Sequence, residues 1–193
     1  MQDSWYEIIG SGKPLSQGEL IFDCPLITWK GEKISHVNKL DPDILEAATE
    51  AVRADVIVMT QACDLANNKV ENVILCPHLS IDEFKKSWED DFKKKAQTPT
   101  PKAWKGVCDS ICNGFIWNQS MLNSGDVGGK KIDKRVVFFH EVYTIPRIFL
   151  ESLVKAPDKI RIELKPPYRE HLSQAFARFF MRVGLPAPID KAW

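Results

Sequence analysis

Short runs of consecutive apolar residues alternate with polar, turn-rich segments along most of the chain. Val56–Met59 and Val73–Cys76 are apolar at successive positions, which predicts strands buried on both faces of a sheet. Gln17–Cys24 and Arg135–His140 also have the composition of strands, and Val142–Pro146 extends the second of these. The pattern therefore predicts several short strands that lie far apart in sequence.

Helical spacing of apolar residues appears after residue 80 and again near the end of the chain. Ser80 followed by Glu83 predicts a capping box at the start of one helix. Thr100–Pro101 opens a second helix, since proline is tolerated at the first helical position. In the last helix, Leu172 and Phe176 belong to an apolar stripe that predicts packing against the sheet.

These elements predict an α+β fold. Strands without regular helical crossovers argue against a doubly wound parallel sheet and favour a small, strongly bent antiparallel β-barrel. We expect a single domain over residues 1–193, with a helical insert at 80–118 and a C-terminal helix.

Composition narrows the classes of function. The 193 residues are 44% hydrophobic and carry 26 basic and 26 acidic side chains, so the chain lacks the strongly basic character of many nucleic-acid-binding domains. The N-terminal residues do not resemble a signal peptide, and no apolar run reaches the roughly 18–20 residues of a membrane span. Five irregularly spaced cysteines favour reduced thiols and a cytoplasmic protein without a membrane partner.

Polar and reactive side chains gather just after the first buried run, in the loop Thr60–Asp64. Cys63 in this loop is a candidate thiol nucleophile, although Asp64 beside it would raise rather than lower its pKa. A zinc site drawing on Cys76, His78, Cys108 and Cys112 is the other option, but their spacing does not match compact zinc motifs. We expect core thiols rather than a bound metal.

A second cluster of candidate residues lies on the C-terminal helix. Tyr168 and Arg169 lie at its start, and His171 and Arg178 share one stripe beside the apolar face. Such a stripe either binds a phosphate group or forms a solvated flank whose apolar stems cover the core.

The order of these elements resembles that of the PemK/MazF-like toxin domain. The resemblance is carried by four segments, GELIFDC, RADVIVMTQACDLANNKVENVILCPHLS, VFFHEVYTIPRIFLESLVK and HLSQAFARFFMRVGLP. The chain is also similar to a group of uncharacterised bacterial proteins that share an [ST]-Q-x-C-D-[LI] loop and a YREHLSQAFARFF helix. The resemblance covers most of the chain except the helical insert.

The resemblance implies an SH3-like barrel, often dimeric, that acts as a metal-independent endoribonuclease in a toxin–antitoxin pair. It places the catalytic groups at Arg53 and Thr60, with Gln61, Asp64 or His140 nearby. Two features depart from the family. The proline that follows the arginine is absent, and Glu141–Tyr143 replaces a polar Gln-Ile-Arg segment.

Two functional hypotheses follow, beside a third in which Cys63 belongs to a thiol- or metal-dependent site. In the first, the protein is a bacterial toxin–antitoxin or phage-defence component that cleaves or binds RNA, or that acts through a protein partner such as an antitoxin. In the second, it is a non-catalytic module whose Thr60–Asp64 loop grips a protein or small ligand. Neither hypothesis calls for a cofactor. The candidate catalytic residues are Arg53, Thr60, Gln61 and Asp64, and the candidate ligand-binding residues are Cys63, His140, Tyr168, Arg169, His171 and Arg178.

Overall fold

A computed structural model describes residues 4–30, 42–156 and 160–181 of the protein. The elements follow one another as β1 (Tyr6–Ile9), β2 (Glu19–Trp29), α2 (Pro42–Ala47), β3 (Thr49–Val58), α3 (Ala62–Ala66), β4 (Asn72–Ser80), α4 (Ile81–Lys94), α5 (Pro101–Cys112), β5 (Gln119–Leu122), β6 (Gly125–Val127), β7 (Lys130–Ile132), β8 (Arg135–Phe138), β9 (Tyr143–Pro146), α6 (Arg147–Val154), β10 (Arg161–Leu164) and α7 (Tyr168–Phe180).

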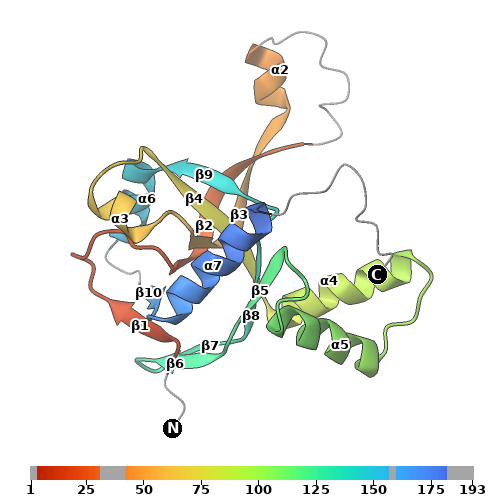
Figure 1. The fold of residues 1–193 in the computed structure, drawn as a ribbon. Helices are drawn as coiled ribbons and strands as arrows, with labels where there is room; N and C mark the ends of the chain where they lie inside the picture. Colours follow the sequence, from red (N-terminus) through yellow and green to blue (C-terminus); the bar gives the residue numbers. More distant parts are fainter. Residues whose placement is uncertain (1–3, 31–41, 157–159, 182–193) are drawn as a thin grey trace, which may run out of the picture.

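The strands form one large antiparallel sheet and one small hairpin. The large sheet has the order β1-β10-β2-β3-β4-β8-β5, with β9 also paired to β4, and β6 pairs with β7 (Figure 1). Every strand pair is antiparallel. The α+β class and the antiparallel sheet expected from the sequence are therefore confirmed, whereas the described strands do not close into a barrel.

The centre of the sheet is buried on both faces, as the consecutive apolar residues predicted. Ile57 of β3 belongs to a core that α7 covers through Leu172. Val56 and Val58 point to the opposite face, into a second core that α6 covers through Leu150. Because neighbouring residues in a strand point to opposite faces, a run without polar residues supplies both cores.

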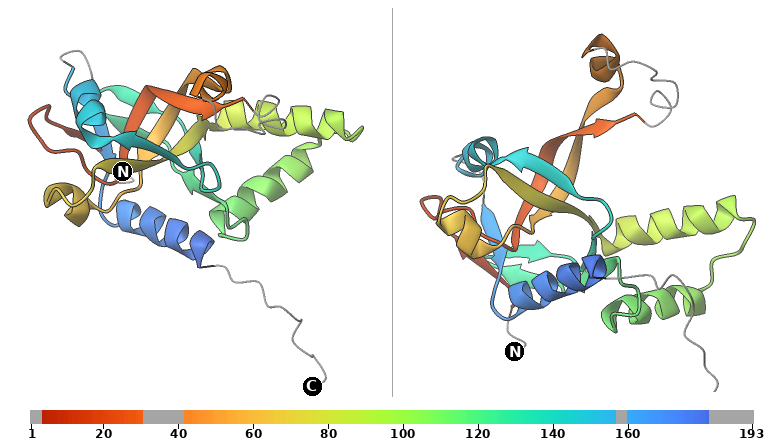
Figure 2. Two further views of the ribbon diagram at one scale, coloured as in Figure 1. Left: turned by 90° about the horizontal axis from the view of Figure 1, so that it is seen from above. Right: turned by 45° about the horizontal axis from the view of Figure 1, so that its top comes forward.

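Helices α4 and α5 form a pair that projects to one side of the sheet, within the range predicted to hold a helical insert (Figure 2). The predicted capping box is confirmed, since the Ser80 hydroxyl accepts from the Glu83 amide and the Glu83 carboxylate accepts from the Ser80 amide. A third core of Phe84, Ile111 and Val136 joins the helices to β8.

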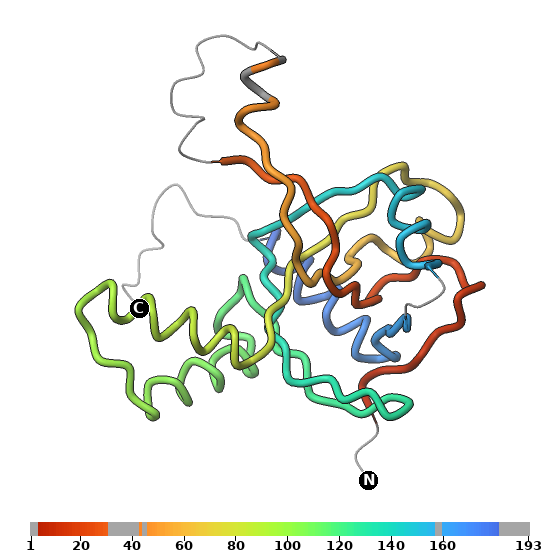
Figure 3. The backbone as a smooth tube through the Cα atoms, turned by 180° about the vertical axis from the view of Figure 1, so that it is seen from behind, coloured from red at the N-terminus to blue at the C-terminus, as the bar shows by residue number. Residues whose placement is uncertain are grey.

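Strands β2 and β3 continue beyond the sheet as a two-stranded ribbon (Figure 3). The ribbon begins at a register shift between Ile21 and Cys24, where Asp23 adopts a left-handed conformation with φ of 54°. Beyond this bulge, Cys24–Trp29 pairs with β3, while β10 pairs only with Leu20 and Glu19. The other edge of β2 therefore has no partner strand in the described part of the chain.

No helix within the described ranges combines the length and the apolar character needed to cross a lipid bilayer.

Candidate functional site

The structure does not bring together the two residues expected to be catalytic. Arg53 and Thr60 lie seven residues apart along one extended segment, which corresponds to about 20 Å at the rise of a β-strand. Arg53 is exposed and forms an ion pair with Asp23 at 2.7 Å. Thr60 is buried, and its hydroxyl oxygen accepts from the main-chain amide of Ile74 at 2.7 Å. Each side chain thus already has a local partner, and the Thr60 contact is structural.

The segment after Thr60, expected to be a loop, contains the short helix α3. Gln61 precedes this helix, and its carbonyl oxygen accepts from the amides of Asp64 and Leu65. The exposed Cys63 sulfur lies 3.6 Å from the Gln61 side-chain oxygen and 3.7 Å from an Asp64 carboxylate oxygen. Both neighbouring oxygens accept hydrogen bonds, and neither belongs to a histidine that could act as a general base for the thiol.

The residues proposed to bind a phosphate at the start of α7 have neighbours of their own. The Tyr168 ring stacks on Trp5 with centroids 4.2 Å apart. Arg169 donates to the carboxylate of the next residue, Glu170, at 2.7 Å. The positive charge of Arg169 is thereby matched, and Tyr168 serves to attach the N-terminal segment to the helix.

Further along α7, the guanidinium of Arg178 lies 5.7 Å from the ring centroid of Trp117, within the range of a cation–π contact. His171 is exposed on the same helix. Of the two stripe residues, Arg178 therefore packs against Trp117 and His171 is exposed.

His140 lies in residues 139–142, which connect β8 to β9 and which we call the excursion. Strands β8 and β9 both lie along the same edge of β4. The excursion lies between the pairs Val137↔His78 and Tyr143↔Leu75. Between these pairs, two residues of β4, Cys76 and Pro77, face five residues of the other chain segment. Pro77 has no amide hydrogen and cannot donate a main-chain hydrogen bond. The excursion places polar side chains at the boundary of two hollows.

The first hollow, which we call the seam, has a volume of about 710 Å³ and runs between β2 and β9. Successive residues of both strands border it, namely Pro25–Trp29 of β2 and Tyr143–Pro146 of β9, and His140–Val142 just before β9 complete this side. Because the side chains of successive residues point to opposite faces, such a lining follows the edge of a strand. Strand β9 pairs only with β4 among the described strands, so two unpaired edges face this cavity.

The seam also exposes large apolar side chains. Ile27 is 76% exposed and Trp29 is 56% exposed, both on β2, and Val142 and Phe149 contribute from the opposite side. Exposed apolar groups beside an unpaired strand edge are typical of an interaction surface.

The second hollow, which we call the aromatic hollow, has a volume of about 620 Å³ and lies between the α4–α5 pair and the same excursion. Its aromatic lining comes from Phe84, Trp88, Phe138 and Tyr143. Burial, with a smaller contribution from Glu141, raises the pKa of Tyr143, so its hydroxyl is neutral at physiological pH.

The linings of the two hollows have carboxylates but no ammonium or guanidinium groups. Glu141 borders both hollows and Asp91 borders the aromatic hollow, whereas neither lining includes a lysine or an arginine. His140 lies beside Glu141, with its Nε2 atom 3.4 Å from the carboxylate. This surface is suited to a cationic or apolar ligand and unsuited to a phosphate backbone.

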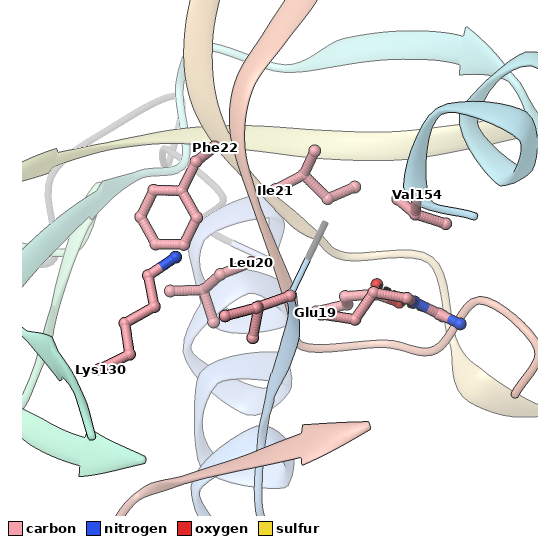
Figure 4. A pocket seen from close by; sticks show the side chains of 8 residues that line it. Glu19, Leu20, Ile21, Phe22, Lys130 and Val154 are labelled. Atoms are coloured by element: carbon pink, nitrogen blue, oxygen red, sulfur yellow. Dashed lines mark hydrogen bonds and ion pairs between the residues drawn. The ribbon is translucent and has the colours of Figure 1, made fainter. Parts of the chain in front are cut away.

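A smaller cavity of about 210 Å³ lies beside the first residues of β2, next to the start of β10 (Figure 4). Lys130 reaches across it, with its amine 5.0 Å from the ring centroid of Phe22. The buried floor holds Glu19 in an ion pair with Arg161 at 2.7 Å. All three nitrogens of that guanidinium already donate to protein oxygens, so the pair has a structural role.

A buried polar network lies near Phe22. Arg135 donates from Nε to Nδ1 of His78 at 2.6 Å and from Nη2 to the Asp55 carboxylate. Burial, followed by the charge of Arg135, lowers the pKa of His78 well below its usual value. The imidazole is therefore neutral, and its Nε2 atom is buried without a hydrogen-bond partner.

Within the described residues, no group of three or more His, Cys, Asp or Glu side chains is arranged to hold a metal ion. Comparison with models of protein families, with curated proteins and with solved structures finds no match.

Proposed function

We propose that the protein is a binding module that takes an extended polypeptide segment of a partner protein into the seam. The observation that carries this proposal is the pair of strand edges, on β2 and β9, that border one cavity of about 710 Å³. A strand added at an exposed sheet edge gains main-chain hydrogen bonds, and the alternate side chains provide selectivity. The apolar groups of Ile27 and Trp29 would then be covered in the complex.

This proposal develops the hypothesis of a non-catalytic module and moves the binding surface from the Thr60–Asp64 loop to the seam. The ribonuclease hypothesis has less support, because Arg53 in β3 and Thr60 beyond its end lie far apart along the chain and each has a local partner. We further propose that the bent sheet is an open relative of the SH3-like barrel of PemK/MazF-like domains. A toxin–antitoxin or phage-defence setting with a protein partner is compatible with both proposals.

The proposal is tested by selecting random twelve-residue peptides, displayed on phage, against the full chain. We expect enriched peptides that slow amide hydrogen exchange in residues 25–29 and 143–146. Ile27→Lys should weaken their binding at least tenfold, since this side chain borders the seam.

The matched control is Ile148→Lys, which alters a similarly exposed isoleucine outside the seam lining and should leave peptide affinity unchanged. A selection without enriched peptides would overturn the proposal. Peptides that bind the Ile27→Lys variant as tightly as the unaltered protein would overturn it too.

A further inference from the structure

We propose that the aromatic hollow receives a lysine or arginine side chain from the segment that occupies the seam. This inference rests on the proposed function and specifies the chemistry of the partner: an extended, largely apolar segment with one basic residue. Three features of the described residues carry it, and each concerns a different aspect of the two hollows.

The first feature is continuity between the hollows. His140, Glu141 and Tyr143 border both the seam and the aromatic hollow. A segment lying along β9 toward the excursion therefore brings its next side chain to the mouth of the aromatic hollow. A long side chain is needed to enter it, since the segment itself stays beside the strand edge.

The second feature is a preformed set of aromatic rings. Phe84 lies 5.8 Å from Phe138 and 5.6 Å from Trp104, and Trp88 lies 5.3 Å from Trp104, all measured between ring centroids. Mutual packing holds these rings in place before a ligand arrives. Aromatic faces attract a cation within about 6 Å, and the apolar stem of lysine or arginine packs against the same rings.

The third feature is the charge of the lining. Glu141 from the excursion and Asp91 from α4 border the hollow, and no lysine or arginine does. Asp91 pairs with Lys94 at 3.2 Å, but both groups are largely exposed, so an incoming cation can replace this weak surface pair. A neutral segment would gain no ion pair with Glu141 or Asp91, whereas a basic residue at this position would.

The peptides recovered in the selection above provide the test. We expect them to share a lysine or arginine at one fixed position, and its replacement by glutamine should lower affinity about tenfold. The paired substitution Glu141→Gln with Asp91→Asn should weaken the basic peptide to a similar extent and should weaken the glutamine peptide clearly less, because the glutamine peptide carries no cation for these carboxylates.

Asp90→Asn is the matched control, because Asp90 lies on the same helix as Asp91 and pairs with Lys93 but does not border the hollow. Combined with Glu141→Gln, it should have a smaller effect than the paired substitution. Peptides that bind the seam without a basic preference would overturn this inference while supporting the proposed function. A selection that yields no peptides would overturn both.

Discussion

Arg135 and His78, 57 residues apart in the sequence, form a buried hydrogen bond in which the Nε–H of the arginine donates to Nδ1 of the histidine over 2.6 Å. The imidazole can accept this bond only while Nδ1 is unprotonated. A second positive charge beside Arg135 would also be poorly solvated, because His78 is 1% exposed. The fold therefore requires a neutral histidine at this position.

We predict that the protein loses stability as the pH falls from 7.5 to 5.5. The unfolded chain binds a proton at His78 near its ordinary pKa of 6.5, whereas burial and then Arg135 lower the pKa in the folded state. The proton therefore stabilises the unfolded state, by about 1.3 kcal/mol at pH 5.5 relative to pH 7.5. Urea unfolding at the two pH values measures this difference.

His78→Gln should be less stable overall but should show a smaller difference between the two pH values. His140→Gln is the control variant, since it also removes one histidine, but from an exposed position. An unaltered pH dependence in His78→Gln would contradict the prediction.

Two arginine–carboxylate pairs of equal length should differ widely in their importance for stability. Arg161 and Glu19 are almost completely buried, and Arg161 also donates to carbonyl groups in the Gly10–Pro14 segment. Arg161→Met leaves a buried carboxylate unpaired and should cost about 3–5 kcal/mol of unfolding free energy. Arg53→Met breaks an exposed pair and should cost at most about 1 kcal/mol.

Urea unfolding of the single variants and of Arg161→Met combined with Glu19→Leu measures the difference. The double variant should recover part of the loss, because it removes the unpaired charge. Equal costs for the Arg161 and Arg53 substitutions would show that burial does not govern these pairs.

Local sequence patterns predicted the parts of the fold that depend on local chemistry. Val56–Met59 indicated burial on both faces, and Ser80 with Glu83 indicated the capping box, because each feature needs only neighbouring residues. Leu172 on the last helix also faces the core as its spacing predicted.

The seam and the buried polar pairs could not be found in this way. Glu19 and Arg161 are 142 residues apart, and nothing in either segment identifies the other. The seam depends on the register of β9 against β4 and on the bulge in β2, which together set where two strand edges meet. Val142–Pro146 was expected to extend the strand Arg135–His140, whereas the structure separates β8 from β9 at this point.

Thr60 is expected to support the fold rather than catalysis. Its hydroxyl oxygen accepts from the Ile74 amide, so Thr60→Val leaves a partly buried donor unpaired and should cost about 1 kcal/mol. Thr60→Ser keeps the hydroxyl and should cost less than Thr60→Val. Thermal or urea unfolding measures both variants, and equal stability of the two would contradict this role.

Mixed-sequence RNA incubated with the purified chain in EDTA should remain intact. The reason is that Arg53 lies in β3 and Thr60 lies two residues beyond its end, about 20 Å away at the rise of an extended chain, which is too far to act on one phosphate. Gel electrophoresis of labelled RNA, with an active ribonuclease as the positive control, measures this. Cleavage that both Arg53→Ala and Thr60→Ala abolish would contradict the prediction and revive the ribonuclease hypothesis.

The five cysteines should separate into distinct classes of reactivity. Cys63 and Cys112 are exposed, whereas Cys24 and Cys76 are fully buried. Burial raises the pKa of Cys76 to about 12 and also raises that of the partly buried Cys108, so few thiolates form at these positions near neutral pH. A chromogenic disulfide reagent at pH 8 should react rapidly with two thiols in the folded protein and with all five in guanidinium chloride.

Cys63→Ser should remove one rapidly reacting thiol and leave peptide binding in the seam unchanged, because the sulfur contacts only its neighbours Gln61 and Asp64 among the described interactions. Cys112→Ser is the matched control and should also remove one. If Cys63→Ser abolished peptide binding, the Thr60–Asp64 loop would regain its place as the binding surface, and the seam would lose its main support.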